Sequence, residues 1–200
     1  MRPQCYGCKA VNHLKWCMSL IGFKALPWMV ETTRALFGTI EVDTGLRRYR
    51  RAHISMAKKN GKSAFCGWLP LYHIDQENEV DPRVVGIATT RKQASEVFDS
   101  AALLVDSSPL MQRTFEVIKS SKTIRHRSKA GRYEVLSADG DRNDGVRASL
   151  WICDELHRFK SQKEEGIRDA VNRATRGRKH PLGIDITTAG DPTESRLWLN

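Results

Sequence analysis

The hydrophobic pattern of the chain alternates between short apolar runs and longer segments with helical spacing. Continuous apolar runs at 84–89 and 150–153 predict strands buried on both faces, which is typical of parallel sheets. A third strand is predicted over 182–190. Apolar residues recur at helical spacing over 94–105 and 167–174. This order predicts an α/β fold, with a mostly parallel sheet and helices on both of its faces.

A glycine–lysine turn follows a predicted strand at 51–57 and precedes a helical pattern at 63–72, inside which Pro70 is expected to kink or end the helix. Backbone amides in such a turn surround phosphates; the lysine neutralises the β- and γ-phosphates, and the next hydroxyl faces Mg²⁺. The first glycine of the usual pattern is replaced by Met56, and a basic surface loop is the alternative. The predicted ATP-binding residues are Lys58, Lys59, Asn60, Gly61, Lys62 and Ser63, with Lys62 catalytic and Ser63 a magnesium ligand.

Two adjacent carboxylates, Asp154 and Glu155, directly follow the buried strand at 150–153. Ligands of parallel sheets bind at the carboxyl ends of the strands. Asp154 is therefore predicted to hold Mg²⁺, and Glu155 to orient and deprotonate the attacking water. Thr187 and Thr188 end the third strand and are the predicted residues that sense the γ-phosphate. A solvated acidic pair is the alternative, but the loop and the carboxylates together favour an ATPase.

The net charge of +10, from 33 basic and 23 acidic residues, suits a polyanionic partner. Segment 119–132 contains no acidic residue, and the predicted strands 123–126 and 133–137 suggest a hairpin or edge insertion there. Its cations are predicted to contact duplex phosphates, with a solvated surface as the alternative. These candidates are Lys119, Lys122, Arg125, Arg127, Lys129 and Arg132.

The five cysteines, an odd number, argue against a disulfide framework. Cys5, Cys8, His13 and Cys17 resemble a zinc knuckle, but the spacing from His13 to Cys17 is one residue shorter than usual. Helix packing by His13, Leu14 and Cys17 is therefore favoured over zinc. No apolar run is long enough to span a membrane, and charged residues interrupt the apolar N-terminus, so an intracellular protein is expected.

Several motifs together resemble the ATPase motor of tailed-phage terminase large subunits, over about residues 23 to 195. They are found at 26–28, 36–38, 58–63, 137–139, 154–157 and 186–190. The resemblance implies a P-loop NTPase of the ASCE type, with ATP and Mg²⁺ as cofactors. It implies ATP-driven translocation of double-stranded viral DNA into a procapsid in the host cytoplasm. The implied partners are the portal, the small terminase subunit and further copies of the chain in a ring, without a membrane.

Three departures from that family's pattern are noted: two in the ATP-binding region and one in the expected domain organisation. Met29 stands where a glutamine would contact adenine, and Lys58 stands where an arginine is usual, so the planar guanidinium fork is lost. The expected organisation is an N-terminal segment over 1–22 and the ATPase domain over 23–200, without the family's C-terminal nuclease domain.

Ring-forming motors often complete one subunit's site with an arginine from its neighbour. Arg147 is the candidate for this arginine finger; the alternative is that it pairs with Asp141 or Asp144. Two other functions stay open: a P-loop DNA-dependent ATPase or helicase outside packaging, and a truncated, non-catalytic DNA-binding remnant. Helicase motifs are not found, and the presence of Lys62 with both carboxylates argues against the remnant.

Overall fold

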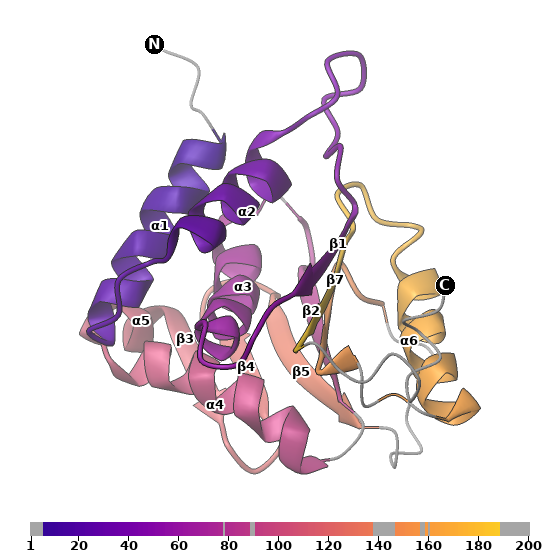
Figure 1. Cartoon of the computed structure of the whole chain (residues 1–200). Coiled ribbons are helices and arrows are strands. Elements are labelled where there is room, and N and C mark those ends of the chain that lie inside the picture. Colours follow the sequence, from indigo (N-terminus) through magenta and orange to yellow (C-terminus); the bar gives the residue numbers. More distant parts are fainter. Residues whose placement is uncertain are drawn as a thin grey trace.

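The computed structural model describes residues 6–77, 79–88, 91–137, 147–156, 159 and 161–188. In these residues, helices and strands are interspersed along the chain (Figure 1). The helices are α1 (Tyr6–Leu20), α2 (Pro27–Gly38), α3 (Lys62–Gln76), α4 (Arg91–Asp106), α5 (Pro109–Thr114) and α6 (Gln162–Ala174). The strands are β1 (Arg51–Ser55), β2 (Arg83–Ala88), β3 (Phe115–Ile118), β4 (Thr123–His126), β5 (Arg132–Ser137), β6 (Leu150–Asp154) and β7 (Leu182–Thr187).

The described strands form one sheet of seven, in the order β1-β7-β6-β2-β5-β4-β3. The first five strands in this order, which are β1, β7, β6, β2 and β5, are mutually parallel. Strands β4 and β3 continue the sheet in antiparallel pairing. The predicted α/β class with a mostly parallel sheet is confirmed. The predicted hairpin exists as β4 and β5, but β5 also pairs with β2, so it lies inside the sheet and is no edge insertion.

Helices cover both faces of the sheet, as predicted (Figure 1). Val84 and Ile152 point into a large core shared with α1 to α5, whereas Val85 and Trp151 point into a smaller core under α6. Successive strand residues face opposite sides of a sheet. The residues on both faces of β2 and β6 are therefore buried, which explains the continuous apolar runs of these strands.

Helix α3 continues through Pro70 to Gln76, so the expectation that this proline could end the helix early was wrong. An internal proline costs about 3 kcal/mol in an isolated helix. Here most of the helix is buried, and Trp68, Leu69 and Leu71 are fully buried around the proline. Tertiary burial therefore outweighs the local preference.

The predicted packing role of the N-terminal histidine and cysteine is visible on α1. Leu14 and Cys17 are fully buried, and His13 Nδ1 accepts a hydrogen bond from Trp68 Nε1 at 2.9 Å. Burial lowers the pKa of His13 to about 4 and raises that of Cys17 to about 12. Cys5 lies outside the described residues, within which no group of three or more His, Cys, Asp or Glu side chains is placed to hold a metal. In the same part of the chain, no helix is both long and apolar enough to cross a membrane.

Candidate nucleotide-binding site

The glycine–lysine turn connects β1 to α3, as the sequence predicted. Lys59 has φ 65° and Gly61 has φ 74°, and α3 begins directly afterwards at Lys62. The left-handed conformation at Gly61 is one that glycine adopts without steric cost. A tight turn that opens a helix in this way presents backbone amides and the positive end of the helix dipole to an anion.

The side chain of Lys62 lies inside this turn. It is only 8% exposed, and its Nζ donates hydrogen bonds to the carbonyl oxygens of Met56 at 3.2 Å and Ala57 at 2.9 Å. In contrast, Lys58, Lys59 and Ser63 are exposed. The turn thus holds one ammonium group at its centre, where a phosphate could replace carbonyl oxygens as its partner.

Residues upstream of β1 support the turn from outside. Trp28 Nε1 donates a hydrogen bond to the carbonyl oxygen of Asn60 at 3.2 Å. A Cβ on Gly61 would lie 2.6 Å from Met29 Cε and 2.9 Å from Phe23 Cζ. The fully buried Met29 therefore packs against the turn. The sequence did not suggest this contact, because it indicated only that Met29 replaces the family's adenine-contacting glutamine.

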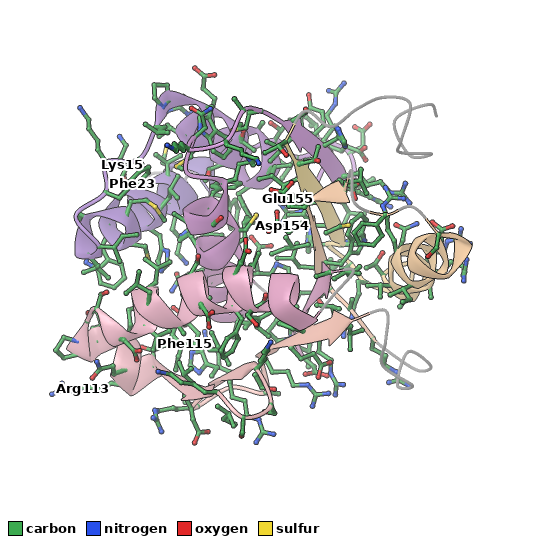
Figure 2. The ribbon with its side chains drawn as sticks, turned by 60° about the horizontal axis from the view of Figure 1, so that its bottom comes forward. Lys15, Phe23, Arg113, Phe115, Asp154 and Glu155 are labelled. Atoms are coloured by element: carbon green, nitrogen blue, oxygen red, sulfur yellow. The ribbon has the colours of Figure 1, made fainter. Side chains whose placement is uncertain are left out.

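Asp154 ends β6, and Glu155 follows it with φ 55°, an uncommon conformation for a residue with a side chain. The two residues are neighbours at the end of β6 (Figure 2). Burial, followed by the negative charge of Glu155, raises the pKa of Asp154 to about 6, and the charge of Lys62 acts in the opposite direction. The predicted loop lysine and the predicted carboxylate therefore influence one another electrostatically.

The end of β7 connects these two parts of the site. Thr188 donates to Glu155 Oε2 from its hydroxyl at 3.1 Å and from its backbone N–H at 3.4 Å. The carbonyl oxygen of Thr187 accepts a hydrogen bond from the backbone N–H of Met56 at 3.1 Å. The Thr187 hydroxyl is buried and donates to the carbonyl of Thr188. The sequence suggested both threonines as γ-phosphate sensors, but it gave no indication that Thr188 holds Glu155.

Arg147 lies away from the site of its own chain. It precedes β6, whereas Glu155 follows the same strand, so the two residues lie at opposite ends of the parallel strands. Its side chain is exposed, and its carbonyl oxygen accepts a hydrogen bond from Arg178 Nη2 at 3.1 Å. The proposed alternative partners, Asp141 and Asp144, lie outside the described residues.

The candidate DNA-binding cations lie on β4, in the turns before and after it, and at the start of β5, at the antiparallel end of the sheet. The segment has no acid of its own, but the fold supplies carboxylates from other segments. Lys129 pairs with Asp75 at 3.1 Å, Arg132 with Glu134 at 3.4 Å, and the exposed Lys119 with Asp106 at 4.0 Å. Lys122 donates to Ser95, Arg127 donates to two backbone carbonyls, and Arg125 is exposed. The positive charge of this surface is therefore smaller than the sequence suggests.

A separate cavity of about 150 Å³ lies at the other end of α3. Its lining includes Phe37, Tyr72 and the partly buried ion pair of Arg47 with Glu77. Neither the phosphate-binding turn nor the two carboxylates line it. The candidate nucleotide site is therefore chosen by the chemistry of its residues and not by the size of a cavity.

The fold and the site define a P-loop nucleotide-hydrolysing domain. The family model of the terminase large subunit ATPase domain matches residues 27–198, and this chain belongs to that family. The predicted family and ATPase class are thereby confirmed.

Comparison with individual proteins agrees with this assignment. The chain is 30% identical over 152 residues to the terminase large subunit of Enterobacteria phage HK97, covering 74% of this chain and 30% of that protein. The crystal structure of the HK97 large terminase has a TM-score of 0.79 at 25% identity, and covers 96% of this chain and 40% of that one.

More distant structures share the fold alone. The ATPase domain of the Thermus phage P74-26 large terminase has a TM-score of 0.59 at 14% identity, covering 86% of this chain and 68% of that one. The RNA helicase Prp28 from Chaetomium thermophilum has a TM-score of 0.52 at 16% identity, covering 96% of this chain and 46% of that one. The helicase similarity therefore does not favour a helicase function.

Proposed function

We propose that this chain hydrolyses ATP with Mg²⁺ and thereby drives double-stranded viral DNA into a procapsid. The chain spans about a third of the length of its curated relative, so the activity of the whole terminase is carried over as a proposal. The supporting observation is the arrangement at the carboxyl edge of the sheet. There α3 begins at Lys62, β6 ends at Asp154, and Thr188 donates two hydrogen bonds to Glu155.

The oxygen donors of the site fit magnesium. Ser63 offers a hydroxyl in the first turn of α3, and Asp154 offers a carboxylate at the end of β6. Mg²⁺ prefers oxygen ligands and commonly combines one or two protein groups with substrate phosphates. When bound, Mg²⁺ neutralises charge on the β- and γ-phosphates.

The remaining steps belong to side chains of the chain. Lys62 binds the phosphates in place of the carbonyl oxygens that it now contacts. Glu155 orients the attacking water and accepts its proton, and the hydrogen bonds from Thr188 fix one carboxylate oxygen for that task. The backbone contact from Thr187 to Met56 links this threonine pair to the phosphate-binding turn.

The chemical assignment is tested by the substitutions Glu155→Gln and Lys62→Ala. Glu155→Gln keeps the shape of the side chain, so ATP binding persists while hydrolysis falls by about two or more orders of magnitude. Lys62→Ala instead weakens nucleotide binding itself. Glu116→Gln, on the distant strand β3, is the matched control and leaves both unchanged. Normal turnover in Glu155→Gln would reject the assigned base.

The proposed DNA surface is the cationic segment 119–132, which comprises β4, the turns on either side of it and the first residue of β5. Neutralising Lys119, Arg125 and Arg127 lowers the log–log salt slope of duplex binding by roughly 2–3, because fewer counterions are released. These three side chains are exposed, and none is held by a buried carboxylate. An unchanged slope would make the segment an ordinary solvated surface.

The proposed assembly follows the same assignment. The portal, the small terminase subunit and further copies of this chain in a ring are the proposed partners, and the host cytoplasm is the proposed location. Arg147 lies at the amino ends of the parallel strands, whereas the candidate site lies at their carboxyl ends. Within such a ring, Arg147 is therefore able to act only on the site of a neighbouring copy.

A further inference from the structure

The hydroxyl of Tyr133 lacks a hydrogen-bond partner within the described residues. Tyr133 lies on β5 and is fully buried, and its Oη is sealed from solvent. A buried hydroxyl without a partner costs free energy, so native proteins nearly always give such a group a protein or water partner.

A small cavity joins Tyr133 to the candidate magnesium carboxylate. The cavity has a volume of about 10 Å³, and residues of β2, β5 and β6 line it together with Val97 of α4. Among the side chains that line it, those of Tyr133 and Asp154 are polar and all others are apolar. A volume of roughly 10–15 Å³ suffices for one water molecule, provided that polar groups are present to bind it.

The residue at the centre of β2 preserves this space. Gly86 lines the same cavity, and a Cβ at this position would lie 2.7 Å from Tyr133 Oη. A larger residue would displace the hydroxyl from the cavity. The glycine, the buried tyrosine and the carboxylate on three adjacent strands therefore form one local arrangement.

We propose that one ordered water molecule occupies this cavity and bridges Tyr133 Oη to the carboxylate of Asp154. The hydroxyl donates to the water, and the water donates to the carboxylate, which is thereby held in the orientation that Mg²⁺ requires. Tyr133 is then a positioning residue for the metal site. Groups that orient a metal ligand in this way commonly change metal affinity when they are removed. This inference rests on the proposed role of Asp154 in binding Mg²⁺.

The substitution Tyr133→Phe removes the hydroxyl and keeps the ring. Calorimetry with a non-hydrolysable ATP analogue, repeated over a series of Mg²⁺ concentrations, measures the half-saturating Mg²⁺ concentration. We expect it to rise about 3–10-fold, below the 10–100-fold typical of directly bonded partners, because the contact is made through water. Tyr72→Phe is the matched control, since Tyr72 is equally buried on α3 but lines the distant cavity.

Thermal unfolding of the metal-free protein gives a readout that is independent of nucleotide. Tyr133→Phe lowers the unfolding temperature if the water bridge exists, because its removal leaves the water and the carboxylate short of a partner. The same substitution leaves the temperature unchanged or raises it if the hydroxyl is simply unpaired. Gly86→Ala is expected to raise the half-saturating Mg²⁺ concentration in the same way. In a protein that already carries Tyr133→Phe, it is expected to add little to that rise.

A crystal structure of the wild-type chain completes the test. Electron density for a water within hydrogen-bond distance of both Tyr133 Oη and Asp154 supports the proposal, and an empty cavity overturns it. An unchanged Mg²⁺ requirement in Tyr133→Phe overturns the positioning role. If the wild type binds no Mg²⁺-nucleotide, the proposed function fails, whereas the water density and the sign of the stability change still decide whether the bridge exists.

Discussion

The raised pKa of Asp154 predicts that this carboxylate destabilises the metal-free protein above about pH 6. Burial disfavours the ionised form, and Glu155 adds negative charge beside it. Because the folded pKa lies above the unfolded value, the contribution of Asp154 to stability is fully present below the unfolded pKa. It is lost as the pH rises through about 6. The substitution Asp154→Asn removes this titration while keeping the shape of the side chain.

The magnitude follows from the two pKa values. An unfolded aspartate titrates near 3.8 and the folded one near 6. At about 1.4 kcal/mol for each factor of ten in proton affinity, ionisation within the fold costs about 2–3 kcal/mol relative to the unfolded chain. From pH 4 to pH 7, the unfolding free energy of Asp154→Asn should therefore increase by that amount relative to the unfolding free energy of the wild type.

The assay is urea unfolding of both proteins in EDTA at several pH values between 4 and 8. Taking the difference between the two proteins cancels other titrating groups that do not contact Asp154. Addition of Mg²⁺ at pH 8 should then stabilise the wild type more than Asp154→Asn, since the ion compensates the buried charge. Asp169→Asn, at an exposed position on α6, is the control and should show no comparable pH dependence.

A difference that stays constant from pH 4 to pH 8 would refute the reasoning, because the carboxylate would then ionise as easily in the fold as in the unfolded chain. A difference that grows as the pH falls would show that ionised Asp154 is stabilised by its surroundings. In the first case the charge of Lys62 would balance the effect of burial on Asp154, and in the second it would outweigh that effect.

Two further predictions concern the catalytic base and the assembly. Thr188→Val should lower the turnover of ATP about tenfold while binding persists, because Glu155 loses a hydrogen bond that orients it; the buried Thr175→Val serves as control, and equal losses in both would indicate a general packing effect. Mixing Arg147→Ala chains with Lys62→Ala chains should restore part of the ATPase activity that neither variant shows alone, if Arg147 acts across an interface. Absence of rescue in rings shown to contain both variants would remove Arg147 from the site.

The sequence by itself determined the elements and the chemistry at their ends. The apolar runs of β2 and β6 predicted strands buried on both faces, since a strand between two layers of helices buries the residues on both of its faces. Two parts of the candidate site were recognisable from residues adjacent in the sequence. They are the turn at Gly61 and Lys62 and the carboxylate pair Asp154 and Glu155. A positive φ favours glycine, and a strand end places the following residues at the sheet edge.

Only the tertiary structure decided which segments meet. The proline in α3 was tolerated because burial of the helix outweighed its local cost, and β5 joined the interior of the sheet by pairing with β2. The contact of Thr188 with Glu155, the packing of Met29 on Gly61 and the pairing of Lys129 with Asp75 all join residues distant in the chain. Such contacts depend on strand order and helix placement, which periodicity does not encode because it reports only which face of each element is buried.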